Sequence, residues 1–484
     1  SSHVDSSFGP RSSTAPFFPI VASVHCAMSK YNLSTPQYIE TNVTDSFRLQ
    51  EASAALLGKG IVEAFEAAEG NVALRATTKA AIGAVVLEVP FDLCVTSSDL
   101  SGHHLSERIP ADDLFGRLLV ALLVLMKERP EDPRSIYFER VCPPGHFDAT
   151  MMACWPSDGD VARRLAHSVA WRRARSLLAE AEQESAALAA HGLSVAPSQY
   201  LRAKLICCTR ALTTGGKWGM ALCPGWDIAN HSSNVPTVQT RVLEDSVRYD
   251  AVQPIDPGDE ITQCYDPSAD FLDLFERYGF FDARSAVCTA ELVVPRAALV
   301  REGDSEWRRR LVEQCAEEGC DEGLQAWWLP DCRAEGSPLV AAVRAGLLSE
   351  GELPAEAASL GDWSFLKAPI HAEAAARGRV AELVEAHLRG YATCLEEDER
   401  ALGAALLRGE GTAAAEVSAL RLLRFEKALL REQAALLSSA AVAVPREKQQ
   451  PSGIRPAHLL IRLSLLPLLV LLLTRHLLLQ CTQL

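Results

Sequence analysis

The sequence lacks the motifs that mark several large enzyme classes. It contains no P-loop, no GxGxxG fingerprint, no GxSxG nucleophile elbow and no HExxH zinc motif. Its 14 cysteines include no CxxC pair, and Cys315, Cys320 and Cys332 do not have the spacing of paired zinc ligands. Nucleotide hydrolysis, serine hydrolysis and metal catalysis therefore find no support, and we predict free thiols and no bound metal.

Lysine is scarce, with nine residues among 47 basic ones, and the arginines are scattered along the chain. The net charge is −15, which argues against a broad electrostatic grip on nucleic acid. The chain is 48% hydrophobic and 23% charged over 484 residues, which is typical of a globular protein and excludes a mainly disordered one. A single core rarely exceeds about 300 residues, so we predict at least two domains.

Both ends of the chain differ from its middle. Residues 1–39 are rich in Ser, Thr and Pro, which leaves open a transit-peptide remnant or a disordered extension. After a polar break at residues 445–456, the segment 459–479 is rich in leucine, but it contains Pro467. A membrane tail anchor, an interfacial helix and an aberrant extension of the reading frame remain open for this segment.

The hydrophobic pattern predicts strands, a helical insertion, more strands and then helices. Residues 85–89 predict a strand that ends at Pro90, and residues 238–243 and 247–252 predict a hairpin. Residues 260–265 predict a further short strand.

Two helices are indicated before residue 200, one over residues 171–190 and one with a single apolar face formed by Leu114, Leu118, Ala121, Leu122 and Leu125. From about residue 300 onward the pattern is helical throughout. There we expect a core-facing stripe of Leu422, Phe425, Leu429 and Leu436.

Five segments, taken in order, carry a resemblance. Residues 69–77 (EGNVALRAT) precede Glu88-Val-Pro90, and residues 207–210 read CCTR. Residues 226–231 (WDIANH), 257–265 (PGDEITQCY) and 274–280 (LFERYGF) follow. This order resembles the SET-domain methyltransferases typified by the Rubisco large-subunit lysine methyltransferase and the actin-histidine methyltransferase. Residues 390–398 (GYATCLEED) and 424–427 (RFEK) more weakly resemble signatures of that family's helical substrate-binding domain.

The resemblance implies an α+β chain. A SET domain with a pseudoknotted β-fold would occupy residues 51–295, with a helical insertion at about 105–205. An all-α substrate-binding domain would occupy residues 300–440. A variable extension would form residues 1–50, and a linker with the Leu-rich tail would form residues 445–484.

The resemblance also implies S-adenosylmethionine as the cofactor, bound on one face, with the acceptor side chain entering from the other. By carry-over, Arg75 and Arg210 would hold the cofactor's carboxylate or shape its pocket. Asn230 and His231 would hold its amino end, and Asp227 would support that loop.

On the acceptor side, Tyr265 would lie beside the transferring methyl group and Tyr278 would form a wall of the channel. Trp226 and Leu212 would contact the substrate. Only a neutral amine attacks a sulfonium methyl. A lysine with a pKa of about 10.4 therefore needs about 4.6 kcal/mol to lose its proton at pH 7. An apolar channel next to a cationic sulfonium lowers that pKa.

The chain departs from the family pattern at three places. Asp266 stands where the family has Gly after the catalytic Tyr, the Ser-Asn that should follow is absent, and the opening Gly-x-Gly is one residue longer at Gly70. Gly offers backbone freedom that Asp lacks, so Asp266 could tilt Tyr265. In the acceptor pocket Trp226 resembles the histidine branch, but Leu212 cannot hydrogen-bond an imidazole and favours lysine.

We therefore expect a protein-lysine N-methyltransferase (EC class 2.1.1) with a non-histone protein as its substrate. The acidic charge and the absence of a cysteine-rich zinc segment point away from a dedicated histone enzyme. The alternatives are an actin-type protein-histidine methyltransferase and an inactive SET-like scaffold. We expect a cytoplasmic monomer, with plastid, nuclear and tail-anchored locations as alternatives, and no nucleic acid partner.

Overall fold

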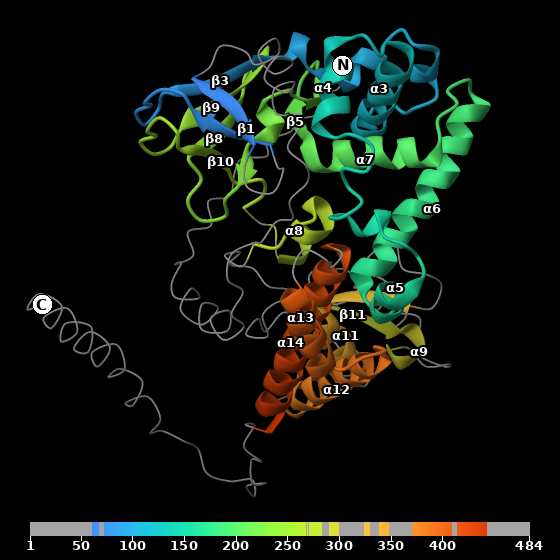
Figure 1. Ribbon diagram of the computed structural model, residues 1–484. Coiled ribbons are helices and arrows are strands. Elements are labelled where there is room, and N and C mark those ends of the chain that lie inside the picture. Colours follow the sequence, from blue (N-terminus) through green and yellow to red (C-terminus); the bar gives the residue numbers. More distant parts are fainter. Residues whose placement is uncertain are drawn as a thin grey trace, which may run out of the picture. The chain divides into compact units, whose positions relative to one another are not determined.

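The computed structural model describes residues 61–66, 72–267, 269, 271–282, 290–299, 324–329, 338–347, 370–408 and 414–442 (Figure 1). The described residues up to Ala441 belong to one compact unit. The predicted extensions 1–50 and 445–484, with the Leu-rich segment 459–479, lie outside these ranges, as does Gly70. Within the ranges, no helix has the length and hydropathy needed to cross a membrane. The domain boundaries given above stay predictions.

The strands up to residue 263 form three small sheets (Figure 1). The first has the order β1-β2-β10-β7, the second β3-β9-β8 and the third β4-β6-β5. The strands are β1 (Val62–Glu66), β2 (Val72–Ala76), β3 (Val85–Pro90), β4 (Val95–Thr96), β5 (Ala211–Gly215), β6 (Gly219–Leu222), β7 (Asn230–His231), β8 (Val238–Val242), β9 (Ser246–Ala251) and β10 (Glu260–Gln263).

The local strand predictions are confirmed. Strand β3 buries Val86, Leu87 and Val89 and ends at Pro90, which has no N–H to donate to a neighbouring strand. Strands β8 and β9 pair antiparallel, and the Leu243 N–H donates to the carbonyl oxygen of Ser246 at 2.8 Å, which closes the predicted hairpin.

The helical insertion separates β4 from β5. It contains α3 (Leu114–Glu128), α4 (Pro133–Val141), α5 (Gly159–Leu165), α6 (Val169–Ala190) and α7 (Pro197–Arg210). The side chains of Asp113, Asp132 and Ser168 cap α3, α4 and α6 by accepting backbone N–H groups of the first turn. Both helices predicted in this region, over residues 114–125 and 171–190, are confirmed.

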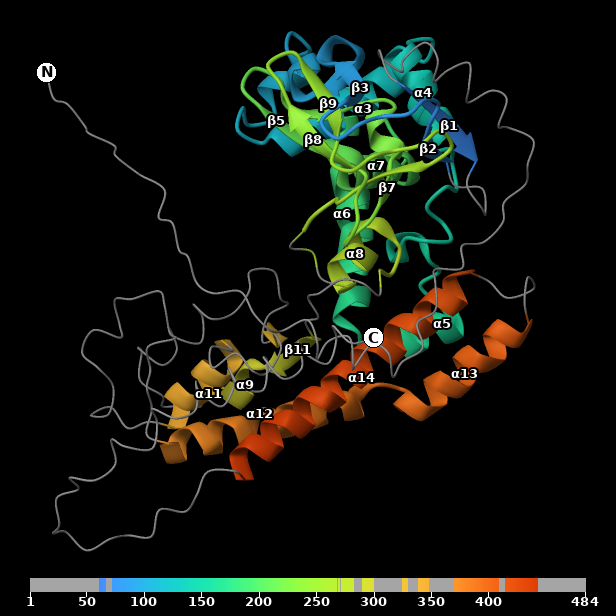
Figure 2. The ribbon, with the colours of Figure 1, turned by 90° about the vertical axis from the view of Figure 1, so that its left-hand side faces the viewer.

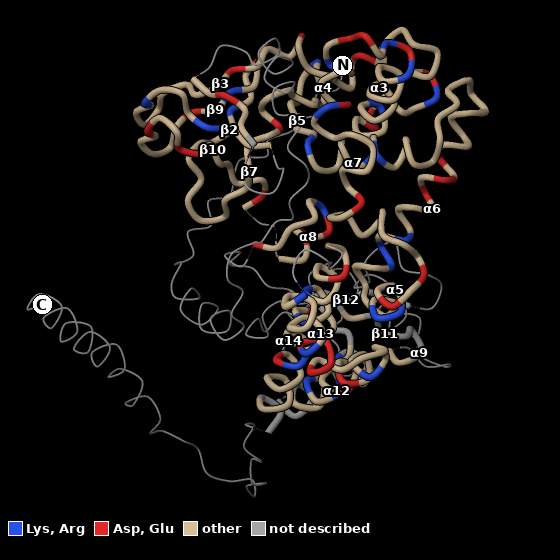
Figure 3. Tube along the Cα trace, in the orientation of Figure 1, with Lys and Arg blue, Asp and Glu red and all other residues tan. Residues whose placement is uncertain are grey.

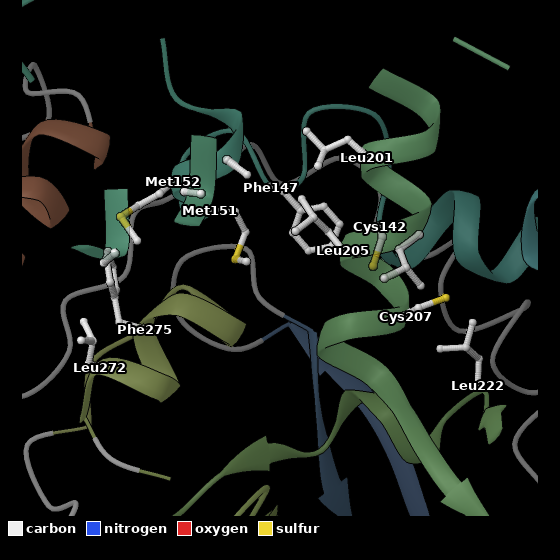
Figure 4. Close-up of a cluster of buried hydrophobic side chains, with 14 of the residues drawn as sticks. Cys142, Phe147, Met151, Met152, Leu201, Leu205, Cys207, Leu222, Leu272 and Phe275 are labelled. Carbon is white, nitrogen blue, oxygen red and sulfur yellow. The ribbon is translucent and has the colours of Figure 1, made fainter. Parts of the chain in front are cut away.

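A continuous apolar core joins the insertion to the helix α8 (Phe271–Tyr278). Figure 4 shows Leu201 and Leu205 of α7 grouped with Phe147, while Leu272 and Phe275 of α8 lie near Met152. All of these side chains are buried. Because α8 packs on this core, the loop that precedes it, which carries Tyr265, is anchored at its far end.

The C-terminal part is not all-helical, which corrects the prediction for residues 300–440. Strand β12 (Leu324–Leu329) lies inside that range and pairs antiparallel with β11 (Ala290–Pro295). Its aromatic pair, Trp327 and Trp328, favours a strand. The helices of this part are α9 (Arg296–Leu299), α11 (Pro338–Leu347), α12 (Ile370–Gly390), α13 (Leu395–Arg408) and α14 (Ala414–Val442).

The predicted apolar stripe on α14 is wrong at one position. Leu422 is fully buried, but Leu436 is 39% exposed. The buried leucines of the helix's last turns are Leu430 and Leu437, which repeat the position of Leu423 every seven residues. The helix therefore presents a slightly rotated face to the core.

A buried carboxylate connects the helical insertion with the C-terminal helices. The side chain of Asp398, on α13, is 0% exposed and accepts hydrogen bonds from Lys427 and from Thr393. Arg164, on α5, donates to Oδ1 of the same Asp398 carboxylate at 3.2 Å. Figure 2 shows α5 beside α13 and α14.

A second polar contact lies next to this one. The Ser168 hydroxyl, at the start of α6, donates to Glu426 at 2.8 Å, and the Tyr391 hydroxyl donates to the same carboxylate at 3.2 Å. Acidic and basic residues are interleaved along α12–α14 in Figure 3, but these contacts differ from surface pairs because they are buried.

Asp398→Asn tests how much the buried Asp398 carboxylate contributes to stability. Lys427 is 2% exposed on its side chain, so loss of the carboxylate removes the counter-charge to which this buried ammonium is hydrogen-bonded. We expect a loss of about 3–5 kcal/mol in the free energy of unfolding, measured by urea denaturation. Glu382→Gln, which removes an exposed pair with Arg379 on α12, is the control and should cost less than about 1 kcal/mol. Equal effects of the two variants would contradict the assignment.

Candidate active site

The site forms where a loop and a strand end meet. Strand β7 pairs parallel with β10, with Asn230 opposite Thr262 and His231 opposite Gln263. The Ser232 N–H then donates to the Gln263 carbonyl oxygen at 2.8 Å. The prediction that the strand over residues 260–265 ends beside residues 227–231 is confirmed, although the strand itself stops at Gln263.

A buried carboxylate holds the loop that enters β7. The side chain of Asp227 is 0% exposed. Its Oδ1 accepts the Tyr137 hydroxyl at 2.5 Å and the Gly225 N–H at 3.2 Å. The same hydroxyl accepts the Gly225 N–H at 2.9 Å. Gly225 has a φ of +84°, which a side chain would disfavour, so the loop turns sharply here.

Arg210 supplies the charge that balances this carboxylate. It ends α7, and its Nη1 donates to the Asp227 carbonyl oxygen at 2.9 Å and lies 3.3 Å from Oδ2. Burial raises the pKa of Asp227, and the guanidinium opposes that rise. The Nε of Arg210 is buried and has no hydrogen-bond partner among the described residues. One donor of this buried cation is thus left over.

Arg75 and Asn230 lie on either side of β10. Arg75, on β2, is half-exposed, pairs with Glu63 at 2.6 Å and stands opposite Glu260 in the sheet. Its guanidinium lies 5.3 Å from the centre of the Phe65 ring. The Asn230 amide donates to the Glu260 carboxylate at 2.7 Å. The sheet order β2-β10-β7 therefore brings both predicted cofactor contacts to the same strand.

Tyr265 closes over the loop from the strand end. Its hydroxyl donates to the Ala229 carbonyl oxygen at 2.9 Å, and its N–H donates to Nδ1 of His231 at 3.1 Å. Its ring lies 4.8 Å from that of Tyr278 and 6.2 Å from that of Phe280, centre to centre. The predicted catalytic tyrosine, the end of α8 and the loop are therefore brought together.

The predicted acceptor-side residues differ in their surroundings. Tyr278, at the end of α8, faces Tyr265, and burial raises its pKa. Leu212, on β5, is partly buried against the core. Trp226 is 8% exposed, and its indole N–H donates to the Thr240 hydroxyl at 3.2 Å. The substrate roles of Trp226 and Leu212 stay predictions.

Asp266 pairs with Arg277 of α8 at 3.7 Å. Beside this residue, the Tyr265 hydroxyl donates to the Ala229 carbonyl oxygen and the Tyr265 N–H donates to Nδ1 of His231. We considered from the sequence that Asp266 could tilt Tyr265. With Asp266 in place, the tyrosine is still hydrogen-bonded to the loop.

Three residues of the site were missed by the motifs. Tyr137 lies on α4, 90 residues before its partner Asp227, and no pattern in the sequence connects the two. Ser233 accepts from or donates to Nε2 of His231 at 2.7 Å, and its hydroxyl donates to Asp282 at 2.6 Å. Ser233 and Asp282 each lie two positions after the end of a matched segment, and this proximity is the signal that could have found them.

Tyr137→Phe removes the hydroxyl that both Asp227 and Gly225 use. We expect a loss of about 1–3 kcal/mol in the free energy of unfolding, since a buried carboxylate oxygen and a buried N–H lose their shared partner. Urea denaturation measures this. Tyr200→Phe is the matched control, because its hydroxyl binds the 46%-exposed Glu184 and should matter less. A Tyr137→Phe variant as stable as the control would show that the hydroxyl does not hold the loop.

No protein-family model and no curated protein matches the chain. Solved structures do. Rubisco LSMT bound to AdoMet aligns with a TM-score of 0.64 at 16% identity, over 83% of this chain and 93% of that one. The SET domain of LSMT bound to MeLysine and AdoHcy gives the same values. Rubisco LSMT bound to sinefungin and monomethyllysine aligns with a TM-score of 0.63. The chain therefore has the fold of SET-domain methyltransferases.

Proposed function

We propose that this protein is an S-adenosylmethionine-dependent protein-lysine N-methyltransferase that acts on a non-histone protein. The observation that carries the proposal is the parallel pairing of β7 with β10, which brings Tyr265 to the loop of Asn230 and His231. The similar structures of Rubisco LSMT hold AdoMet or AdoHcy and lysine or methylated lysine, which supports the same chemistry here.

The residues present fit the carboxylate and the amino group of S-adenosylmethionine. The unpartnered, buried Nε of Arg210 is a donor that a carboxylate could satisfy. Asn230 has carbonyl capacity left beyond its bond to Glu260, and an amide oxygen accepts from an ammonium. Arg210 and Asn230 would thus hold the group and Arg75 would border it. His231, whose ring nitrogens bind Tyr265 and Ser233, would hold the cofactor's amino end only through its backbone. When bound, S-adenosylmethionine supplies an activated methyl group.

The chain's own residues contribute to methyl transfer by positioning the acceptor amine and by excluding water from it. The rings of Tyr265, Tyr278 and Phe280 lie within 6.2 Å of one another and form an aromatic wall. Such surroundings disfavour an ammonium and favour the neutral amine of a lysine. They also exclude water and hold the acceptor for an in-line approach. The Tyr265 hydroxyl, already anchored to Ala229, is placed to orient the amine.

The lysine acceptor is favoured over histidine because Leu212 offers an imidazole no hydrogen bond. We propose the segment 300–440 as the part that contacts the protein substrate. The arrangement of Tyr265 beside Asp266 favours an active enzyme over an inactive scaffold, since the tyrosine keeps its hydrogen bonds to Ala229 and His231.

Cofactor binding is the first test. S-adenosylhomocysteine should raise the melting temperature, because a ligand that binds only the folded state stabilises it. Asn230→Ala should weaken its affinity about tenfold or more in calorimetry, since one polar contact is lost. Asn234→Ala, at an exposed position four residues along, is the control and should bind like the wild type. If the wild type binds nothing at millimolar ligand, the proposal fails.

Tyr265→Phe is the second test. It removes one hydroxyl and almost no volume, so cofactor affinity should stay near that of the wild type. Methyl transfer should fall roughly 10²–10³-fold, because one preorganised hydrogen bond at the reacting centre typically contributes about 2.7–4 kcal/mol. Incorporation of radioactive methyl groups into proteins of a cell lysate measures it.

Two further variants interpret this test. Tyr200→Phe removes a hydroxyl far from the loop and should leave transfer unchanged. Asp266→Gly restores the family's residue and should be neutral or mildly activating. A wild type without transfer that Asp266→Gly does not rescue would favour the scaffold, whereas full turnover of Tyr265→Phe would show that another residue is catalytic.

A further inference from the structure

Behind Tyr265 lies a chain of hydrogen bonds that none of the roles above uses. The Tyr265 N–H donates to Nδ1 of His231 at 3.1 Å. Nε2 of His231 lies 2.7 Å from the hydroxyl oxygen of Ser233, and that hydroxyl donates to Oδ2 of Asp282 at 2.6 Å. The carboxylate itself is 3.6 Å from Nε2. Ser233 therefore stands between the imidazole and the carboxylate.

The directions of these bonds fix the protonation of the ring. A backbone N–H always donates, so Nδ1 of His231 must carry a lone pair. A neutral imidazole with a free Nδ1 carries its proton on Nε2, which then donates to the Ser233 oxygen. The Ser233 proton is left for Asp282, in agreement with the short distance between them. Every member of the chain has one compatible orientation.

We propose that Ser233 and Asp282 are positioning residues that hold the backbone of Tyr265 by keeping the proton of His231 on Nε2. The proposal rests on the proposed function, in which the place of Tyr265 governs methyl transfer. The geometry is that by which carboxylates and backbone groups orient histidines elsewhere, with a serine inserted as an intermediate.

Protonation of His231 would break the chain. A proton on Nδ1 would face the Tyr265 N–H, so two donors would meet and the bond would be lost. Burial lowers the pKa of His231, and the Asp282 carboxylate opposes this. Besides that carboxylate, the described groups that pack on the ring are the aromatic rings of Tyr265 and Phe280. The Tyr265 bond should therefore persist at neutral pH and fail only in acid, below the pH at which an ordinary histidine gains its proton.

The two variants should shift this pH dependence in opposite directions. Asp282→Asn keeps an acceptor for the Ser233 hydroxyl but removes the charge that favours protonation, so the bond should survive to lower pH. Ser233→Ala removes the intermediate, leaving the carboxylate as the nearest partner of Nε2, which favours the imidazolium. A residue with a merely structural role would produce shifts in the same direction or none.

Hydrogen exchange of the Tyr265 amide in the full chain measures the bond without substrate or cofactor. Protein labelled with ¹⁵N-tyrosine gives few amide signals, since the chain has eight tyrosines. At pH 7 we expect exchange about tenfold faster in Ser233→Ala than in the wild type, and recovery in Ser233→Thr, which restores the hydroxyl. Ser232→Ala is the control, because that hydroxyl binds only the Val235 N–H at 3.3 Å among the contacts found for it.

The proposal would be overturned if the Tyr265 amide exchanged equally fast in Ser233→Ala and Ser232→Ala. It would also be overturned if Ser233→Ala and Asp282→Asn moved the pH midpoint of exchange in the same direction. The acid limb of the methyl-transfer profile should follow the same opposite shifts, with S-adenosylhomocysteine affinity within about threefold of the wild type. The amide measurement needs no turnover. A wild type without methyl transfer would therefore refute only the proposed function, and amide exchange would still test the positioning roles of Ser233 and Asp282.

Discussion

The buried carboxylate of Asp227 is the constraint on which the site depends. A lone carboxylate is costly to bury, and here Tyr137, Arg210 and the Gly225 N–H compensate it together. Two of these partners come from α4 and α7, so the shape of the loop depends on the contact between the helical insertion and the sheets. The loop then places Asn230 in register with Thr262, and everything at the strand end follows from that register.

A second buried carboxylate that is compensated by several partners lies in the C-terminal part. Asp398 is fully buried and is compensated by Lys427, by Thr393 and by Arg164 from the insertion. The sequence segments with the weaker resemblance, 390–398 and 424–427, are those whose polar side chains meet in this cluster. Removing one partner of a buried ion pair costs several kcal/mol, so each residue of this cluster depends on the others. These segments join helices, and Phe425 of the second one stacks on Phe271 of α8, the helix that carries Tyr278.

Local patterns predicted local structure well. The hairpin of β8 and β9, the helix α6 and the strand ending at Pro90 all follow from neighbouring residues. The contact of β7 with β10 joins residues about 30 positions apart, and only the family resemblance anticipated it. Pattern alone could not find the pairing of β11 with β12 either, because a non-local pair leaves little trace in each strand. At the site, the hydrogen bonds of the Tyr137 and Ser233 hydroxyls could not be predicted from the sequence, because their partners are set by tertiary packing.

Among the described residues, the charged groups around Tyr265 are paired: Arg210 with Asp227 and Asp266 with Arg277. Arg210 is balanced by Asp227, and the imidazole of His231 is neutral when it accepts the Tyr265 N–H. In the proposed function the sulfonium brings positive charge to this place, while the lysine must arrive there as a neutral amine. A protonated His231, with its ring centre 5.1 Å from that of Tyr265, would add a second cation beside the sulfonium and disfavour its binding. It would also release the tyrosine backbone. The requirement for a neutral histidine thus serves both the electrostatics and the geometry, which accounts for a carboxylate held one hydroxyl away from the ring in place of a direct ion pair.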